Sequence, residues 1–62
     1  MLTCQIQLPV EKSLVHSIEE MTVAQIQVQK FEADQLVLKT DWPAADVIDL
    51  LKQLGIVVIK VL

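Results

Sequence analysis

The chain has 62 residues, a formal net charge of −3 and one cysteine, and 53% of its residues are hydrophobic. This length is enough for one small domain, which buries only about 60% of the surface of its unfolded chain. One cysteine excludes an internal disulfide, and a mild acidic charge argues against nucleic acid as a partner. Because small domains usually need added support, we expect this apolar chain to form a homo-oligomer, most simply a dimer.

The first segment alternates between apolar and polar residues, as a strand with one buried face does. Pro9 ends this strand and suits the first turn of the helix that follows. Apolar residues at steps of four, four and three predict that helix, of about a dozen residues. The apolar side of the strand holds Leu2, Cys4, Ile6 and Leu8, and the helix stripe holds Val10, Leu14, Ile18 and Met21.

Alternation returns after the helix and predicts a β-hairpin. We expect a three-residue loop at positions 32–34, because that length brings apolar side chains together on one face. The expected register pairs Phe31 with Gln35, Val28 with Leu38, Ile26 with Thr40 and Gln27 with Lys39.

A second helix and a last strand complete the chain. Asp41 is predicted as the helix N-cap, Pro43 lies in the first turn, and Gly55 occupies the left-handed position after the helix. The apolar stripe of this helix consists of Ala44, Val47, Ile48, Leu51 and Leu54. The β-branched segment that follows is predicted as a strand. With Lys60 facing water, the inward residues are Val57, Ile59 and Val61, and the outward ones are Val58 and Leu62.

These elements predict an α+β domain over residues 1–62 in the order β-α-β-β-α-β. Two right-handed β-α-β units joined by a hairpin give a four-stranded antiparallel sheet with two helices on one face, the ferredoxin-like sandwich. In this arrangement the first and third strands are central, and the second and fourth strands form the edges.

Most residues with reactive groups have a simple structural interpretation. Cys4 is on the inward side of the first strand, where a cysteine acts as a small hydrophobe. His16 has Glu19 and Glu20 three and four residues on, but this set lacks a third metal ligand and suits a solvated helix face. The acidic residues Asp41, Asp46 and Asp49 belong to the cap and the exposed side of the second helix, and acidic groups early in a helix favour its dipole. Trp42 either covers the end of the core or lines a binding spot beside that helix.

Glutamines dominate the predicted outer face of the sheet, at positions 5, 7, 25, 27, 29 and 35, together with Lys39. One interpretation is a solvated face, which antiparallel sheets often keep. The other is an interface, because uncharged polar groups lose their water more easily than charged ones. Val23 and Phe31 would border this interface. The residues assigned to it are Gln5, Gln7, Gln27, Gln29, Val37, Val58 and Leu62.

The segment LVLKTDWPAADVIDLLKQLGIVVIKVL, from Leu36 to Leu62, combines a strand, a helix with Ala45 and Leu51, and an apolar strand after Leu54-Gly55. It resembles the end of ferredoxin-like regulatory modules, especially the NIL domain found after some methionine-importer ATPases. Related ACT domains share the β-α-β-β-α-β order. The resemblance implies dimerisation through strands and binding of amino acids or similar small ligands at or near the interface.

Taken together, these features favour a non-enzymatic binding or regulatory module that acts as a homo-oligomer and binds a small metabolite at a subunit interface. The alternative is an adaptor that pairs with another protein through an exposed edge strand. An enzyme comes third, because we find no nucleophile–base pair or metal set. We expect no cofactor. No apolar run approaches the roughly 20 residues that cross a bilayer, and no signal peptide opens the chain, so we expect a cytoplasmic protein without a membrane or nucleic-acid partner.

Overall fold

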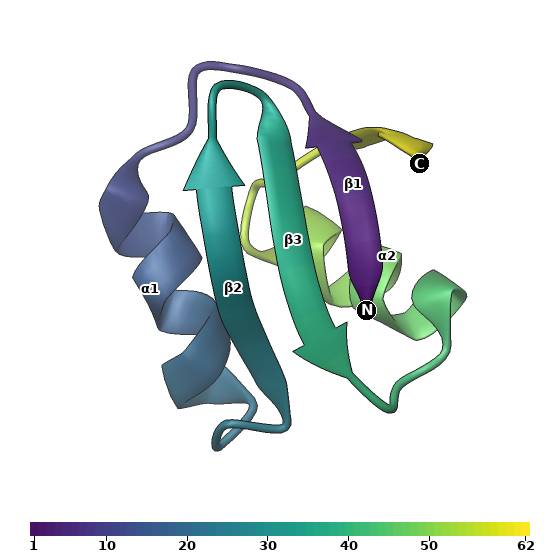
Figure 1. Ribbon diagram of the computed structural model, residues 1–62. Coiled ribbons are helices and arrows are strands. Elements are labelled where there is room, and N and C mark those ends of the chain that lie inside the picture. The colour runs from purple at the N-terminus through teal and green to yellow at the C-terminus, as the bar shows by residue number, and fades with distance from the viewer.

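Strands and helices follow one another in the order β-α-β-β-α-β in the computed structural model, which describes residues 1–62 (Figure 1). The elements are β1 (Leu2–Ile6), α1 (Lys12–Met21), β2 (Ile26–Glu32), β3 (Gln35–Thr40), α2 (Ala44–Gln53) and β4 (Val58–Val61). This order confirms the predicted ferredoxin-like fold. No helix is both long enough and apolar enough to cross a membrane.

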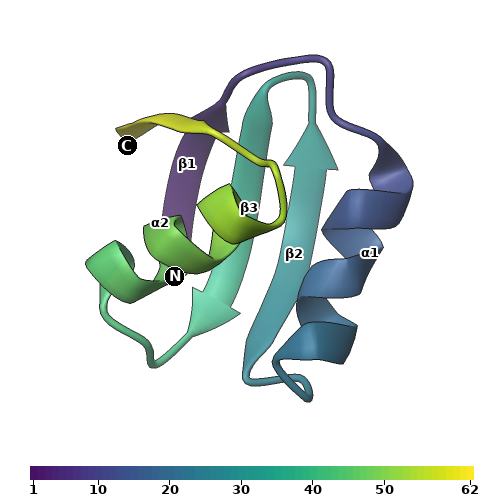
Figure 2. The same cartoon turned by 180° about the vertical axis from the view of Figure 1, so that it is seen from behind.

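The four strands form one antiparallel sheet in the order β2-β3-β1-β4. As predicted, β1 and β3 are central, and β2 and β4 are the edges. Both helices cover the same face of the sheet. In Figure 2, which views the molecule from that side, α2 crosses in front of β1 and β3, and α1 lies alongside β2.

Ten buried apolar side chains form the core between the sheet and the helices. They are Cys4, Ile6, Val15, Ile18, Ile26, Leu36, Leu38, Val47, Leu51 and Ile56. Several expectations for the apolar positions are wrong, among them Ala44, which is exposed at the start of α2. Leu8 is 48% exposed because β1 ends at Ile6, and Met21 is 58% exposed in the last turn of α1. Val15, which was not assigned to the apolar stripe, is buried in the core.

Both helices begin later than predicted. Helix α1 starts at Lys12, so Pro9 lies in the loop before it. Helix α2 starts at Ala44, and Pro43 is itself the N-cap residue, with φ −57° and ψ 145°. Asp41 is therefore not the N-cap. The reason is that a proline disfavours helical backbone in the residue before it, which keeps Trp42 outside the helix.

Both helices end in the same hydrogen-bonded motif. After α2, the N–H of Ile56 donates to the Leu51 carbonyl (2.8 Å), and Gly55 has φ +92°, which confirms its predicted left-handed conformation. These are the features of a Schellman C-cap. After α1, the N–H of Ala24 donates to the Glu19 carbonyl (2.8 Å) in the same pattern. There the left-handed positions hold a valine and an alanine, with φ +52° at Val23 and +63° at Ala24.

The predicted register of the hairpin is correct far from the loop and wrong near the loop. Ile26, Gln27 and Val28 pair with Thr40, Lys39 and Leu38, as predicted. Beyond them the register shifts, and the pairs become Lys30 with Val37, Phe31 with Leu36 and Glu32 with Gln35. A β-bulge at position 29 absorbs the extra residue, so the loop has only two residues, at positions 33 and 34. Consequently Phe31 packs against the core instead of bordering the outer face.

A second register shift reverses part of the prediction for β4. Ile6 pairs with Val58 and Gln5 pairs with Lys60, so Ile59 is the extra residue on this strand. Val58 lies on the core side and packs against the core, and it was wrongly expected outside. Val57 and Ile59 were expected inward, but they are 49% and 59% exposed.

Candidate functional site

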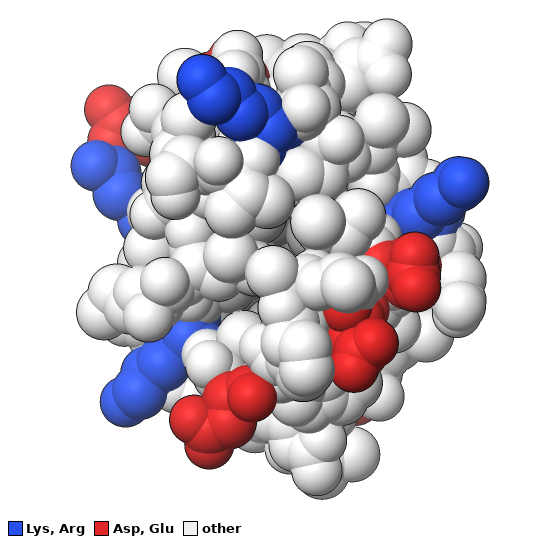
Figure 3. All heavy atoms as spheres, turned by 90° about the vertical axis from the view of Figure 1, so that its right-hand side faces the viewer, with Lys and Arg blue, Asp and Glu red and all other residues white.

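The edge formed by β4 carries the densest group of exposed apolar side chains. Figure 3 looks at this side of the molecule, where charged side chains lie mainly at the margins of a broad uncharged area. We call this surface the β4 edge and define it by Val57, Ile59, Val61 and Leu62, which are 49%, 59%, 40% and 55% exposed. Apolar side chains that stay in water along the open side of an edge strand are typical of surfaces that bind another chain.

The outer face of the sheet is polar, as predicted, and three of the seven residues assigned to the interface lie on it: Gln5, Val37 and Gln27, which is exposed opposite Lys39. Gln5 pairs with Gln35 and Lys60 across the central strands, and its Nε2 donates to Asp34 Oδ2 (2.9 Å). This bond ties the hairpin loop to β1. Val37 is half-buried on the central strand β3.

The remaining residues of the predicted interface do not form one surface. Gln7 follows the end of β1, where its N–H donates to the Val57 carbonyl (2.9 Å). Gln29 is the bulged residue of the opposite edge, and Leu62 lies at the β4 edge.

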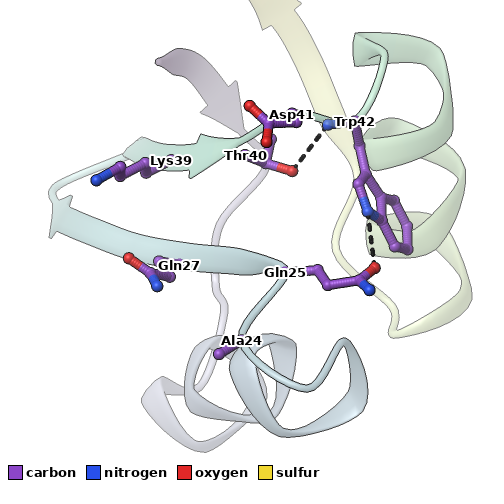
Figure 4. Close-up of a pocket in the computed structure, with 7 residues that line it drawn as sticks. All are labelled: Ala24, Gln25, Gln27, Lys39, Thr40, Asp41 and Trp42. Carbon is purple, nitrogen blue, oxygen red and sulfur yellow. Dashed lines mark hydrogen bonds between the residues drawn. The ribbon is translucent and has the colours of Figure 1, made fainter.

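A hollow of about 490 Å³ opens beside the start of β2 and the end of β3, next to the segment that connects β3 to α2. The residues that line it come from β2, from β3, from the segment before β2 and from the segment before α2 (Figure 4). We call it the Trp42 hollow. It is lined by Ala24, Gln25, Gln27, Lys39, Thr40, Asp41 and Trp42.

Trp42 is held in place at this hollow by two hydrogen bonds. Its backbone N–H donates to Thr40 Oγ1 (3.0 Å), and its indole Nε1–H donates to Gln25 Oε1 (3.1 Å). Figure 4 shows the Gln25 side chain reaching the indole from the other side of the hollow. Trp42 is half-buried and also packs against the core. Trp42 therefore covers the end of the core, as one of the two interpretations predicted, and it also lines this hollow.

The charged groups of the Trp42 hollow are available to a ligand. The one ion pair in the structure joins Lys30 and Glu32 (3.0 Å), on the outer part of β2. Lys39 and Asp41 both line the hollow, are exposed and make no ion pair. An ammonium group, a carboxylate, amide groups and an indole ring together can bind a small polar molecule that has an apolar or planar part.

The predicted helix-face group on α1 has a structural role that the sequence did not indicate. Glu19 Oε1 accepts a hydrogen bond from the backbone N–H of Val28 (2.9 Å) on the edge strand β2. His16 is exposed nearby, beside a smaller hollow of about 280 Å³ between α1 and β2. The structure brings together no group of three or more His, Cys, Asp or Glu side chains that could hold a metal ion.

Two buried residues near these surfaces belong to the core. Cys4 has no exposed surface, and burial raises the pKa of its thiol above the ordinary value. Because the thiolate is the reactive form, this environment makes Cys4 a poor nucleophile. Thr22 is the one buried polar residue: its Oγ1 donates to the Ile18 carbonyl (2.8 Å) and accepts from the Ile26 N–H (3.2 Å). A threonine at the end of a helix can donate its hydroxyl to the carbonyl four residues earlier, and this position could have indicated the role of Thr22.

Comparisons with protein-family models, curated proteins and solved structures find no match for this chain. The fold and the geometry of the two surfaces are thus the basis for inferring what the protein does, and the resemblance to NIL and ACT modules stays a prediction.

Proposed function

We propose that this protein is a non-enzymatic binding module that acts as a homo-oligomer and takes a small polar metabolite in the Trp42 hollow. The observation that carries the proposal is the fixed position of Trp42. The bond from its indole to Gln25 and the bond from its backbone to Thr40 orient the ring before any ligand arrives. A ring fixed in advance loses little conformational freedom on binding, which favours affinity.

The lining suggests the chemistry of the ligand. The unpaired ammonium of Lys39 suits an anionic group, and the unpaired carboxylate of Asp41 suits a cationic or hydrogen-donating group. The amides of Gln25 and Gln27 offer both donors and acceptors. A small molecule with two polar ends and an apolar middle would use all of these groups.

The only tryptophan of the chain lies in the candidate site, so its fluorescence reports directly on binding. We would titrate the protein with amino acids and their carboxylic-acid and amine analogues, recording Trp42 emission and the melting temperature, Tm. A ligand at ten times its Kd adds about 1.4 kcal/mol to stability, which raises Tm by about 6–11 °C in a domain of this size.

Two substitutions test the location of the site. Lys39→Gln should weaken binding of an anionic ligand about tenfold or more, since it removes the one cationic group of the hollow. Lys12→Gln removes an exposed lysine on α1, outside this hollow, and should leave binding unchanged. If emission and Tm stay constant across the whole panel, or if both variants bind alike, the Trp42 hollow is not the ligand site.

An adaptor that pairs with another protein is the second candidate, and the open β4 edge favours it. An adaptor of this kind would show no ligand-induced rise in Tm and would instead retain a protein partner in a pull-down. The titration and the pull-down together separate the two functions.

A further inference from the structure

The two edges of the sheet differ in how far they are protected against pairing with another strand. Helix α1 lies alongside β2 in both views of the fold (Figures 1 and 2), and Glu19 occupies the backbone N–H of Val28. A bulge at Gln29 interrupts the strand, and Lys30 and Glu32 place an ion pair on it. Cover, bulges and charges are the devices by which natural sheets prevent pairing at an edge.

The β4 edge has much less of this protection. Its only charged residue is Lys60, which pairs with Gln5 on the outer face. In Figures 1 and 2, β4 lies in the yellow segment that ends at the C-terminus. No helix lies along its outer side, whereas α1 lies alongside β2. The bulge at Ile59 leaves that side chain 59% exposed at the edge.

Backbone groups are also free at the β4 edge. The N–H of Leu62 donates to the Thr3 carbonyl (2.8 Å), so residue 62 is bonded to β1. In an antiparallel ladder, successive residues direct their backbone groups to opposite sides. The N–H and C=O of Val61 therefore point toward the open edge, where a further strand would bind them.

We propose that two copies of this chain pair antiparallel through β4, so that their two four-stranded sheets become one continuous sheet. A second copy is the occupant that the surface suits best. The same strand laid antiparallel against itself obeys a two-fold axis, so each copy gives and receives the same contacts. The apolar residues of the β4 edge then cover one another, while the charged residues of β2 remain in water on the far side of each copy.

The size of this surface sets the strength of the dimer. A standard interface buries about 800 Å² per partner, roughly a fifth of the 4108 Å² that this chain exposes, and uses about 20–30 residues on each side. The β4 edge has four exposed apolar residues, and two more, Met1 (86% exposed) and Leu8 (48% exposed), lie just before and just after the paired strand β1. The contact is thus smaller than a standard interface, and we expect a Kd in the micromolar range.

The proposal specifies the homo-oligomer of the proposed function and rests on that part of it, but not on the ligand site. The test is sedimentation equilibrium over about 1 µM to 1 mM protein, spanning the expected Kd. Ile59→Lys places a charge on the edge, and Val61→Pro removes the outward N–H at a position where an edge strand tolerates proline. Met21→Lys is the matched control, because Met21 and Ile59 are 58% and 59% exposed.

We expect the wild type and the Met21→Lys variant to dimerise alike, and Ile59→Lys and Val61→Pro to weaken the dimer at least tenfold while keeping a native far-UV circular dichroism spectrum. A dimer that persists in both edge variants would overturn the β4 interface and leave a homo-oligomer of another geometry. A wild-type protein that stays monomeric at the highest concentration would overturn the dimer itself. Trp42 emission, titrated in the same samples, tests the ligand site separately.

Discussion

The end of α1 offers a direct test of the backbone geometry, through the substitution Val23→Gly. Val23 occupies the left-handed position of the helix C-cap with φ +52°, where most helices of this type have glycine. A β-branched residue is especially unfavourable in this conformation, because its Cβ approaches the neighbouring carbonyl. Replacing it with glycine should therefore stabilise the protein.

The gain can be estimated from three terms. Relief of the left-handed conformation contributes roughly 1–2 kcal/mol. Glycine lowers the stability by about 0.5–1 kcal/mol, because it loses more conformational freedom on folding than valine does. Burial lost with the side chain is small, because Val23 is 83% exposed. The net gain is about 0–1.5 kcal/mol, and its central value of about 0.75 kcal/mol raises Tm by about 3–6 °C in a domain of this size.

Thermal unfolding followed by circular dichroism measures the change. The control is the reverse type of substitution, Gly55→Ala, at the C-cap of the other helix. Gly55 has φ +92° at the end of α2, and a Cβ built there meets no atom within 4 Å. Its substitution adds strain without a clash, so Tm should fall by a similar amount. If Val23→Gly lowers Tm while Gly55→Ala also lowers it, the valine side chain stabilises the fold in another way, and the strain argument is wrong.

Three further changes follow from single contacts. Thr22→Val keeps the shape of the side chain but leaves the buried N–H of Ile26 without its acceptor, and should reduce the free energy of unfolding by about 1–3 kcal/mol in urea titration. The raised pKa of Cys4 means that the folded state holds this proton more tightly than the unfolded state, so stability is constant well below the ordinary value of 9.0 and falls as the pH rises through it. Cys4→Val should remove that part of the alkaline loss, and an unchanged pH profile would contradict the assignment. Glu19→Ala should expose the Val28 N–H and speed its hydrogen exchange several-fold, whereas Glu19→Gln, which retains an acceptor, should not.

The order of the elements could be predicted because each depends on a local pattern. Two-residue alternation identified β1 and the hairpin, and the spacing of apolar residues identified both helices. Gly55 was correctly placed in a left-handed position because few other residues tolerate it. The central position of β1 and β3 followed from the right-handed crossover rule, which needs no knowledge of side-chain contacts.

The two bulges could be predicted only in part. On β2 the signal was present, since Val28 and Phe31 are three residues apart and regular alternation would place them on opposite faces. Reading this spacing as a bulge would have placed Phe31 correctly in the core. On β4 no such signal exists, because Val57, Val58 and Ile59 are all apolar and every register buries a similar side chain.

The candidate site could be predicted only in part from the sequence, and the reason differs from that for the bulges. The indole of Trp42 bonds to Gln25, which is 17 residues away, and Gln5 bonds to Asp34 at a separation of 29. Polar pairs of this kind form only after the sheet has brought distant segments together. The sequence could therefore suggest Trp42 as a lining residue but could not identify its partner.

The protection of the β2 edge has a consequence for the proposed assembly. A sheet with two open edges can add neighbours on both sides and grow without limit, which is how fibres form. If two copies pair through β4 as proposed, the strands left at the outer edges would both be β2, where Glu19 bonds to the Val28 N–H and α1 lies alongside. The contacts that shield β2 would then limit the assembly to two copies, because a third copy would have to pair with a protected edge.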